Sequence, residues 1–480
     1  MKKIRLIILN CVLALSMLAL PNVTLAKTLL LDPIVYKNYK PNSSFGISIR
    51  DYKTGYILYS KNGDIPRSPA SSLKLLTGAA ALHTLGTNYR FTTNLYYDGT
   101  ITNGVLNGNI YVQGTGDPTF QYSDFSNFAT HLKSLGIEHV NGYVFADDSV
   151  FSGPIRSPGV MLHEEDEYYA GAATAIMMSP DNNYNAGTLN FTVVGSSVGE
   201  APSYGAGHSY SGLQVVNLAK TVQKGALNTL TIARASGSNQ IIISGNIPVG
   251  ATVKKVITMP NPTTNSIIAF TEAMNQAGIT FQYQNTVAYG NIPSTATYVT
   301  SKQSMTLGEL YPHFMKKSNN VIADVLVKAM GYEVYGVGDL TNGIKVLKNF
   351  GTELGLNMNE WTIVDGSGLS ALNKITPNQL SLLMYKVRST PNYQTFFDGL
   401  IVGGHPDQFQ AGSLSKRFTE WNTRYHIIGK TGYISGTHSL TGLAQGFYSR
   451  NVYMFSIMSD RYGGSIQSID NVMKHIIIHH

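Results

Sequence analysis

The sequence predicts an α/β (α+β) protein in which a large β-rich segment interrupts one mixed domain. Three observations lead to this fold class. Strand-like runs and an amphipathic helix lie near the start of the chain, before residue 90. From about Asn88 to Thr300 the pattern changes to short β-type runs separated by turn pairs. After Thr300, helical periodicity returns and closely spaced strand-like runs follow.

The first 26 residues have the pattern of a secretory signal peptide. Three cations lie among the first five residues, residues 6–20 are almost entirely apolar, and residues 24–26 (TLA) offer a small-residue cleavage site. An uncleaved membrane anchor is the alternative, which the short apolar run disfavours because a spanning helix needs about 20 residues. We therefore expect a periplasmic or otherwise extracytoplasmic protein.

Length, charge and cysteine content set further bounds. A chain of 480 residues is long enough for two or three domains with a sizeable core. The formal net charge is +7, and the predicted signal peptide holds three of the positive charges, which leaves +4. This small net positive charge argues against a nucleic-acid-binding protein. The single cysteine, Cys11, lies in the predicted signal peptide, so we expect a mature chain without disulfides.

The elements follow in order. Residues 44–60 (SFGISIRDYKTGYILYS) form two alternating runs around a polar turn, which predicts a β-hairpin. A helix is expected next, with Ser68 as its cap, Pro69 as its first residue and Gly86 as its end. Turn pairs such as Asn107-Gly108 then divide the β-rich middle, and no fixed-period repeat stands out.

The C-terminal part is expected to contain helices first and strands later. Helical periodicity runs through residues 305–331 and around residues 342–354. Three strand-like runs follow at residues 424–434, 439–448 and 451–460, and a final helix is expected from about Gln467. We infer one discontinuous domain from residues 27–90 and 301–480, interrupted by a β-rich region, residues 91–300, with two subdomains.

Ser71 and Lys74 form the first motif that could carry chemistry. They lie three residues apart at a helix start, so the amine can reach the hydroxyl. The positive end of the helix dipole disfavours a second cation, which lowers the pKa of Lys74 toward that of a usable base. A nucleophile and its base can therefore come from one turn. Ser and Lys are common at helix starts, and Ser413 to Lys416 has the same spacing, so the motif alone is weak.

Ser318-Asn319-Asn320 forms the second motif, at the expected start of an apolar helix. By itself this triplet favours a simple reading in which Ser318 only caps that helix.

Lys430-Thr431-Gly432 forms the third motif, inside an expected strand. A strand edge with Lys and Thr suits an extended peptide and its terminal carboxylate, and Gly allows a ligand's backbone to approach. The same three letters recur at Lys53-Thr54-Gly55, where the lysine of a hairpin turn is most simply solvated. The order and context of the three motifs together match the signature of penicillin-binding proteins and class A β-lactamases, which makes coincidence improbable.

On these motifs the chain resembles the D-alanyl-D-alanine carboxypeptidase/endopeptidases of the penicillin-binding protein 4 type, the low-molecular-mass class C penicillin-binding proteins. Further stretches support the resemblance, above all residues 365–377 (DGSGLSALNKITP) and 429–444 (GKTGYISGTHSLTGLA). The resemblance spans the whole mature chain. It implies a penicillin-binding-protein/serine β-lactamase-like transpeptidase domain, formed by residues 27–90 and 301–480, whose first two motifs are separated by extra domains.

The resemblance also implies the reaction and the role of each residue. Ser71 would be the acylated nucleophile and Lys74 its proton acceptor, while Ser318 would relay a proton to the leaving amine and Asn320 would orient Lys74 and the substrate amide. The remaining roles fall in one strand: Lys430, Thr431 and Gly432 would bind the substrate, and the Tyr433 N–H would complete the oxyanion site. The substrates implied are peptidoglycan stem peptides, with β-lactams as covalent inhibitors. Peripheral membrane or homodimer association stays open.

The chain departs from the family pattern at two places. Asn319 stands where the family most often has Asp. This position varies among Ser-x-Asn motifs, so the departure weakens the resemblance little. Residues 157–160 (SPGV) lack an expected Trp and precede an acidic run, residues 164–167 (EEDE). Our hypothesis is that one of these acids pairs with the free amine of the stem peptide's diamino acid, against the alternative of a solvated acidic loop.

Other functions remain as alternatives. A serine β-lactamase would use the same acylation apparatus, but the sequence has no recognisable deacylation motif. A non-catalytic peptidoglycan-binding protein would not need the nucleophile. An α/β-hydrolase nucleophile at Ser197 is rejected, because Pro202 and a Gly/Ser-rich stretch follow where a helix is required. No metal or dinucleotide motif is supported, so we expect no cofactor.

Overall fold

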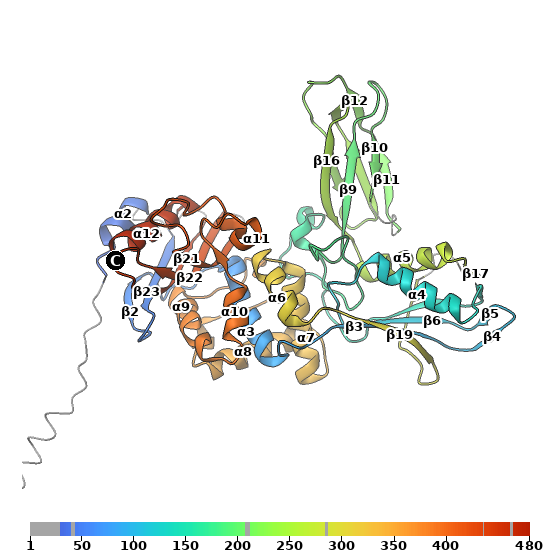
Figure 1. Ribbon diagram of the computed structural model, residues 1–480, viewed down its shortest axis with the longest axis horizontal. Helices are drawn as coiled ribbons and strands as arrows, with labels where there is room; N and C mark the ends of the chain where they lie inside the picture. Colours follow the sequence, from blue (N-terminus) through green and yellow to red (C-terminus); the bar gives the residue numbers. More distant parts are fainter. Residues whose placement is uncertain (1–28, 40–43, 207–211, 284–286, 435, 461–463) are drawn as a thin grey trace, which may run out of the picture.

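The structure, a computed structural model, describes residues 29–39, 44–206, 212–283, 287–434, 436–460 and 464–480. The expected signal peptide, with Cys11, lies outside these residues. Figure 1 shows a mixed α/β body that contains both ends of the described chain, and beside it an elongated region from which an arm of strands rises. The predicted α/β (α+β) fold class is therefore confirmed.

A six-stranded antiparallel sheet forms the centre of the body. It joins the first hairpin to the last three long strands, although about 400 residues separate them. In spatial order the strands are β2 (Ile57–Lys61), β1 (Phe45–Asp51), β23 (Val452–Ser459), β22 (Thr437–Gln445), β21 (Ile427–Ile434) and β20 (Ile401–Val402).

Helices cover both faces of this sheet, which explains why its central strand is apolar at almost every position. On β23, Met454 and Met458 face the core under α9 (Pro377–Lys386), whereas Phe455 and Ile457 face the core under α12 (Ile466–His479) and α2 (Asp32–Asn38). Alternate residues of a strand point to opposite faces, so a strand buried on both sides reads as a continuous apolar run.

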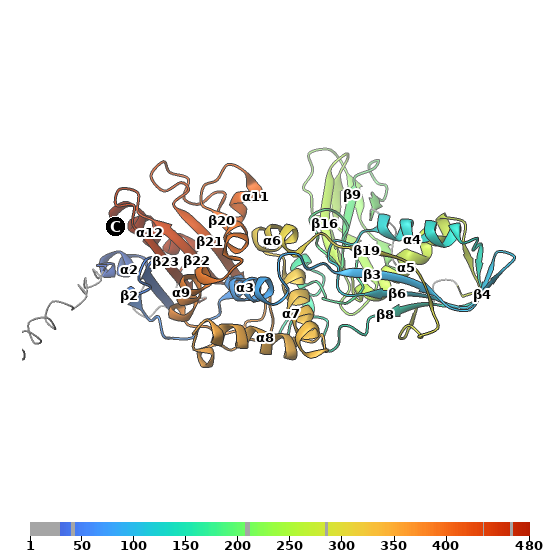
Figure 2. The same cartoon turned by 60° about the horizontal axis from the view of Figure 1, so that its bottom comes forward.

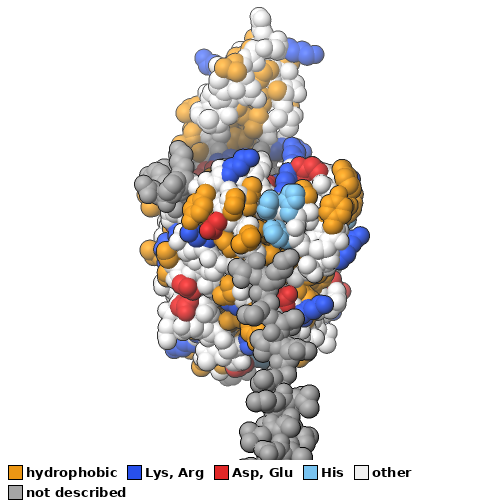
Figure 3. Space-filling view, turned by 90° about the vertical axis from the view of Figure 1, so that its left-hand side faces the viewer, with side chains coloured by type: hydrophobic (Ala, Val, Ile, Leu, Met, Phe, Trp, Pro, Cys, Tyr) orange, Lys and Arg blue, Asp and Glu red, His pale blue; other side chains and the backbone are white. Residues whose placement is uncertain are grey.

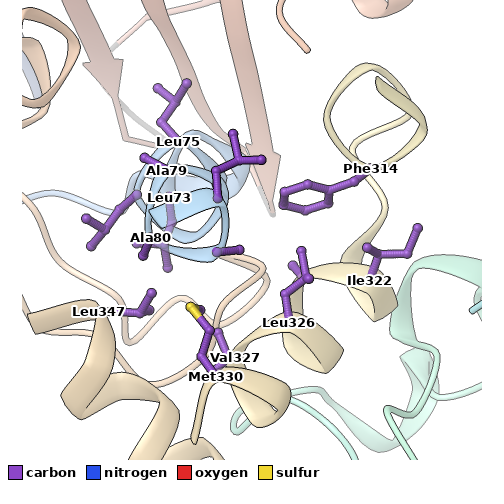
Figure 4. Packing of buried hydrophobic residues seen from close by; sticks show 14 of the residues in the cluster. Leu73, Leu75, Ala79, Ala80, Phe314, Ile322, Leu326, Val327, Met330 and Leu347 are labelled. Atoms are coloured by element: carbon purple, nitrogen blue, oxygen red, sulfur yellow. The ribbon is translucent and has the colours of Figure 1, made fainter. Parts of the chain in front are cut away.

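A helical layer joins the sheet to the rest of the molecule. The central helix of this layer, α3 (Lys74–Thr84), packs against its neighbours through an apolar cluster that includes Ala79, Ala80, Leu326, Met330 and Leu347 (Figure 4). Figure 2 shows α8 running beneath α3 and α7. The helices of this layer are α3 (Lys74–Thr84), α6 (Leu307–Lys316), α7 (Asn320–Tyr335), α8 (Leu340–Glu353), α10 (Tyr393–Asp398) and the short α11 (Gln408–Ala411).

The β-rich middle of the chain folds into several sheets and two helices. Two sheets lie beside α4 (Tyr122–Ser134) and α5 (Pro262–Gln276). Their strands, in spatial order, are β18 (Val287–Tyr289), β8 (Val144–Asp147), β6 (Ile110–Gly114), β3 (Thr92–Tyr97) and β19 (Thr297–Gln303) in one sheet, and β17 (Thr280–Phe281), β7 (His139–Val140), β5 (Val105–Asn107) and β4 (Thr100–Thr102) in the other. The two helices were not expected, and β19 runs three residues past the expected boundary at residue 300.

The arm is built from short strands and stands out above the body when the molecule is viewed from the end that carries β2 and α12 (Figure 3). It shares one continuous apolar core with α4 and α5, since Phe191 and Ile241 belong to the same cluster as Phe125 and Phe270. The strands are β10 (Ser203–Gly205), β9 (Thr188–Val194), β16 (Thr252–Thr258), β11 (Gln214–Asn217), β14 (Gln240–Ser244), β13 (Thr231–Arg234), β12 (Lys220–Val222) and β15 (Asn246–Pro248).

Candidate active site

Ser71 lies in a 3-10 turn, η1 (Ala70–Leu73), that leads directly into α3. The predicted cap at Ser68 is wrong: Pro69 occupies the position before the turn, and no side chain caps it. The reason is a bend at Ala70, whose φ of 46° is left-handed and separates Pro69 from the helix. Backbone strain of this kind is concentrated at functional sites.

Gly432 allows this turn to pack against β21. A Cβ atom at Gly432 would lie 2.7 Å from the Pro69 carbonyl oxygen and 2.9 Å from the Ala70 Cβ. The Ser439 hydroxyl, on β22, donates a 2.6 Å hydrogen bond to the same Pro69 carbonyl. On the side where a side chain would lie, Gly432 is therefore covered by the turn that carries Ser71; Gly432 also lines the cleft, where the approach of a ligand's backbone stays a prediction.

Lys74 is fully buried, and its amine has three oxygen neighbours. Its Nζ lies 3.0 Å from the Ser71 Oγ, 2.6 Å from the Asn320 Oδ1 and 2.5 Å from the Ser367 carbonyl oxygen. A neutral amine has two N–H bonds and one lone pair. The amide oxygen and the backbone carbonyl can only accept, so both N–H bonds go to them and the lone pair is left for the Ser71 hydroxyl.

The environment of Lys74 favours that neutral form. Burial lowers the pKa of Lys74 to about 7, against the opposing pull of the Asp324 and Asp365 carboxylates. Desolvation penalises the charged form of an amine, and nearby negative charge favours it. A pKa near neutrality suits a general base, because a large fraction of the amine is then free of its proton at physiological pH.

A second hydroxyl and amine pair lies across the same cleft. The Lys430 Nζ donates hydrogen bonds of 2.8 Å to the Ser318 Oγ and 2.9 Å to the Thr431 carbonyl oxygen. Burial lowers the pKa of Lys430 well below its ordinary value, and the neighbouring Lys74 adds to this effect.

Ser318 reaches this position through an unusual backbone. Its φ is 56°, in the turn between α6 and α7. The simple reading in which Ser318 caps α7 is wrong, because Asn319 is the cap and its side chain accepts a 3.0 Å hydrogen bond from the Ile322 N–H. The Asn319 amide also donates to the Tyr184 carbonyl oxygen, so the β-rich region helps to hold this turn.

Asn320 connects the base to the β-rich region. Its Oδ1 accepts from Lys74, and its Nδ2 donates a 2.8 Å hydrogen bond to the Tyr169 carbonyl oxygen. These contacts fix the orientation of the side-chain amide. The expected contact with a substrate amide would have to share the Nδ2 with Tyr169.

The edge of β21 lies open toward the cleft. Its outer neighbour, β20, pairs only with Gly429 and Ile428, so residues from Lys430 onward have no strand beside them on that side. The Thr431 and Ser413 hydroxyls are hydrogen-bonded to each other, 2.5 Å apart. The exposed Tyr433 ring stacks on His438, with ring centroids 5.1 Å apart. An open edge with hydroxyls and an aromatic ring suits an extended peptide.

The cleft that joins these groups has a volume of about 1020 Å³. Ser71, Ser318, Asn320, Lys430 and Thr431 all line it, and Gly432 and Tyr433 line it as well. Lys74 lies behind Ser71 with no exposed surface. The other walls of the cleft come from the loops at residues 159–169 and 369–371, the α11 region and the start of α12. The eight residues predicted from sequence therefore lie in or directly behind one cavity.

Several residues of the site were not predicted as site residues. The Ser367 carbonyl contacts Lys74, the Ser413 hydroxyl contacts Thr431, and the buried Asp324 and Asp365 lie close enough to influence the pKa of Lys74. Residues 365–377 were noted only as part of the resemblance. One signal was available for Asp324: it lies four residues after Asn320 on an apolar helix, which is one helical turn away on the same face.

The described residues contain no cluster of three or more His, Cys, Asp or Glu side chains that could hold a metal ion. Within the same residues, no helix is both long and apolar enough to cross a membrane.

The cleft has the arrangement that a serine acyl-transfer enzyme requires: a buried amine faces one serine hydroxyl, and a second hydroxyl and amine pair lies across the cavity. Residues 30–476 match the model of the D-Ala-D-Ala carboxypeptidase 3 (S13) family. The chain belongs to this family and is a serine-type D-Ala-D-Ala carboxypeptidase.

Relatives and solved structures agree with this assignment. The chain is 30% identical over 423 residues to the D-alanyl-D-alanine carboxypeptidase of Actinomadura sp. strain R39, covering 87% of this chain and 78% of that protein. It is 24% identical to the D-alanyl-D-alanine carboxypeptidase DacB of Haemophilus influenzae over 89% of this chain and 87% of DacB. The crystal structure of penicillin binding protein 4 (dacB) from Haemophilus influenzae superposes with a TM-score of 0.78 at 21% identity, covering 93% of this chain and 98% of that one. The expected fold and family are confirmed.

Proposed function

We propose that Ser71 is the nucleophile and Lys74 the general base of a reaction that removes the terminal D-alanine from peptidoglycan stem peptides. The observation that carries this proposal is the position of the buried Lys74 Nζ, 3.0 Å from the Ser71 Oγ and within hydrogen-bond distance of the Asn320 Oδ1 and the Ser367 carbonyl oxygen. The same chemistry would open cross-links between stems in an endopeptidase reaction, and would be blocked by β-lactams that acylate Ser71.

The steps follow from these positions. The Ser71 Oγ attacks the carbonyl carbon of the D-Ala-D-Ala bond while its proton passes to the Lys74 Nζ. The backbone N–H groups of Ser71 and Tyr433 are proposed to hold the oxyanion. Ser318 then passes its proton to the leaving nitrogen and is reprotonated by the proton that Lys74 took from Ser71; the C–N bond breaks, and D-alanine departs. Water finally hydrolyses the ester on Ser71.

Substrate binding is proposed to use the open edge of β21. An extended stem peptide would lie along this edge, with its terminal carboxylate near the Lys430 amine and the Thr431 hydroxyl. The Lys430 Nζ already donates to the Ser318 Oγ, so one amine would serve both the carboxylate and the proton relay. Gly432 and Tyr433 would form the wall beside the peptide.

Mass spectrometry of the protein after incubation with benzylpenicillin tests the assignment of the nucleophile. We expect one covalent adduct, located on Ser71 by peptide mapping, that persists far longer than the time of acylation. An adduct on another residue would contradict the assignment. Rapid release of hydrolysed penicillin would instead support the β-lactamase alternative, and failure of the protein to release D-alanine from a stem peptide would support a binding role.

The acidic run at residues 164–167 gives a proposal for the diamino acid of the stem peptide. Asp166 and Glu167 already pair with Lys255, at 3.0 and 3.3 Å. Glu164 is the one acid of this run that lines the cleft; its carboxylate accepts a 3.3 Å hydrogen bond from the Met161 N–H and a hydrogen bond from the Tyr169 hydroxyl, but has no cationic partner among the described residues. Glu164 is therefore the acid of this run that is best placed to pair with the free amine.

Glu164→Gln should raise KM about two- to fivefold for a stem peptide with a free side-chain amine, the range expected for a partly exposed ion pair. The value of kcat should change little, because Glu164 does not contact Ser71, Lys74 or Ser318. KM measured with the same peptide after acetylation of that amine should not respond to the substitution. Glu167→Gln is the matched control; an equal rise in KM for both variants would contradict the pairing.

We also propose that residues 27–90 and 301–480 form the catalytic domain and residues 91–300 an inserted region with two subdomains. The composition of the six-stranded sheet supports this division, since its strands come only from residues 45–61 and 401–459. The pairing of β3 with β19 closes the insertion at its base. The predicted signal peptide supports a periplasmic or other extracytoplasmic location.

A further inference from the structure

Three polar side chains lie one above another on α7, among the apolar residues of its buried part. Asn320, Asp324 and Lys328 are four residues apart along α7, so they share one face. Asp324 is 5% exposed and Lys328 1% exposed. Burying charged groups is costly unless each has partners, so such a stripe calls for an explanation beyond packing. Asn320 contacts Lys74, but the proposed reaction does not use Asp324.

The carboxylate of Asp324 holds two segments that are distant in sequence. Its Oδ1 accepts a 2.8 Å hydrogen bond from the Gly366 N–H, and its Oδ2 accepts a 2.7 Å hydrogen bond from the Ser157 Oγ. The Ser157 Oγ also lies 3.3 Å from the Ser367 Oγ. Asp324 therefore holds the backbone immediately before Ser367, the residue whose carbonyl accepts from the Lys74 Nζ.

Asp365 holds the same loop from the other side. Its carboxylate accepts hydrogen bonds from the N–H groups of Gly368 and Ser370, each 2.8 Å, and from the Asn373 side chain, 2.9 Å. Three donors within its own loop occupy Asp365, whereas Asp324 bridges between elements. The loop is thus fixed internally by Asp365 and fixed to α7 and residue 157 by Asp324.

We propose that Asp324 is a positioning residue for the acylation step: it holds the Ser367 carbonyl against the Lys74 amine and places a negative charge behind that amine. The proposal rests on the assignment of Lys74 as the base. Loss of the Asp324 charge would make the ammonium form of Lys74 less stable. An isosteric amide can still hold the loop, because its oxygen can accept from the Gly366 N–H while its NH2 donates to the Ser157 Oγ in place of the bond that the carboxylate accepts.

Few charged groups lie around Lys74 and Asp324. Asp324 faces Lys74 and Asp365, and Lys328 faces Asp324 from one turn further along α7. Lys74 faces Asp324, Asp365 and, on β21, Lys430. Burial and the neighbouring Asp365 raise the pKa of Asp324 to about 7. Lys74 and Asp324 therefore titrate together around neutral pH, and the charge of each depends on the other.

The test is the pH dependence of Ser71 acylation in Asp324→Asn, measured as the rate of labelling by a fluorescent penicillin. In the wild type this rate should rise as Lys74 loses its proton and level off above its pKa. A negative Asp324 raises the pKa of Lys74, so removal of the charge lowers it, and the rising limb should move to lower pH by roughly one unit or more. A purely structural role would lower the rate without moving the limb.

Two further variants separate the effect of the charge from loss of structure. Ser157→Ala removes the hydrogen bond that favours the ionised form of Asp324, so its rising limb should move in the same direction as in Asp324→Asn but by less. Asp324→Glu keeps the charge on a longer side chain, so its limb should stay at the wild-type pH, even if Asp324→Asn fails to fold. Thermal unfolding of each variant reports folding separately.

The outcomes distinguish the role of Asp324 from the role of Lys74 as the base. A limb that stays in place in folded Asp324→Asn, or moves in Asp324→Glu, overturns the role of Asp324. A wild-type enzyme whose labelling rate has no rising limb, or whose label is not on Ser71, overturns the proposed function instead, because Lys74 would then not act as the base.

Discussion

Ser71→Ala should abolish the release of D-alanine from a stem peptide, lowering kcat/KM by a factor on the order of 10⁴ or more, because removal of a nucleophile eliminates the acyl-enzyme route. The substitution deletes only the Oγ that contacts the Lys74 Nζ, so the turn and its packing against β21 should persist. The measurement is D-alanine release, together with labelling by fluorescent penicillin, which should vanish as well.

Ser197→Ala is the matched control for this experiment. Ser197 is the central serine of the Gly-x-Ser-x-Gly sequence at residues 195–199, and the strand β10 follows it in the structure where a nucleophile elbow requires a helix. Its replacement should leave kcat/KM unchanged. Activity that survived in Ser71→Ala but disappeared in Ser197→Ala would transfer the nucleophile to the arm and contradict the site described above.

Lys430→Met should lower kcat/KM about 10²- to 10³-fold, the loss usual for removal of one preorganised charged or donor group from an active site. Methionine keeps most of the volume of the buried side chain but cannot donate to the Ser318 Oγ or face a carboxylate. Steady-state kinetics on a stem peptide and the labelling rate with penicillin should both decline.

The second Lys-Thr-Gly sequence of the chain supplies the control. Lys53 lies in the exposed turn between β1 and β2. Its backbone N–H donates a hydrogen bond to the Asp51 side chain, and no hydrogen bond is described for its amine. Lys53→Met should therefore leave kcat/KM and the labelling rate at wild-type values. Equal losses in the two variants would mean that the Lys-Thr-Gly of β21 has no special role.

The sequence predicted most of the catalytic body because its signals are local. The β1–β2 hairpin, the helices within residues 305–354, the final helix and the last three strands each follow a regular period of apolar residues, whereas α9, α10 and α11 were not predicted. Helices α4 and α5 were missed, although Phe125, Phe128 and Leu132 have helical spacing. In α5 the segment PTTNSIIAFTEAMNQ is rich in residues of poor helix propensity, and tertiary packing such as the stacking of Phe125 on Phe270 stabilises it.

The residues of the candidate site also fall into two groups: those that a local motif predicts and those that only the fold brings to the site. Ser71 with Lys74 and Lys430 with Thr431 could be predicted because each pair belongs to one short motif. The Ser367 carbonyl could not, because any residue type offers a backbone carbonyl and only the loop geometry directs it at Lys74. The role of Asp324 needed two further segments, at residues 157 and 366, and no spacing rule connects them.

The sheet at the centre of the body has a consequence for the order of folding. β1 is synthesised early, but its permanent partner β23 is about 400 residues away, so closing this contact costs far more chain entropy than forming a local hairpin. Until the last strands are available, Phe45, Ile47 and Ile49 have no sheet to bury them, and the incomplete chain exposes an apolar strand edge. Strands β3 to β19 pair only among themselves and can fold in the meantime. Ser71 and the Lys430 amine therefore come together only when the C-terminal strands are in place, which makes assembly of this site one of the last steps of folding.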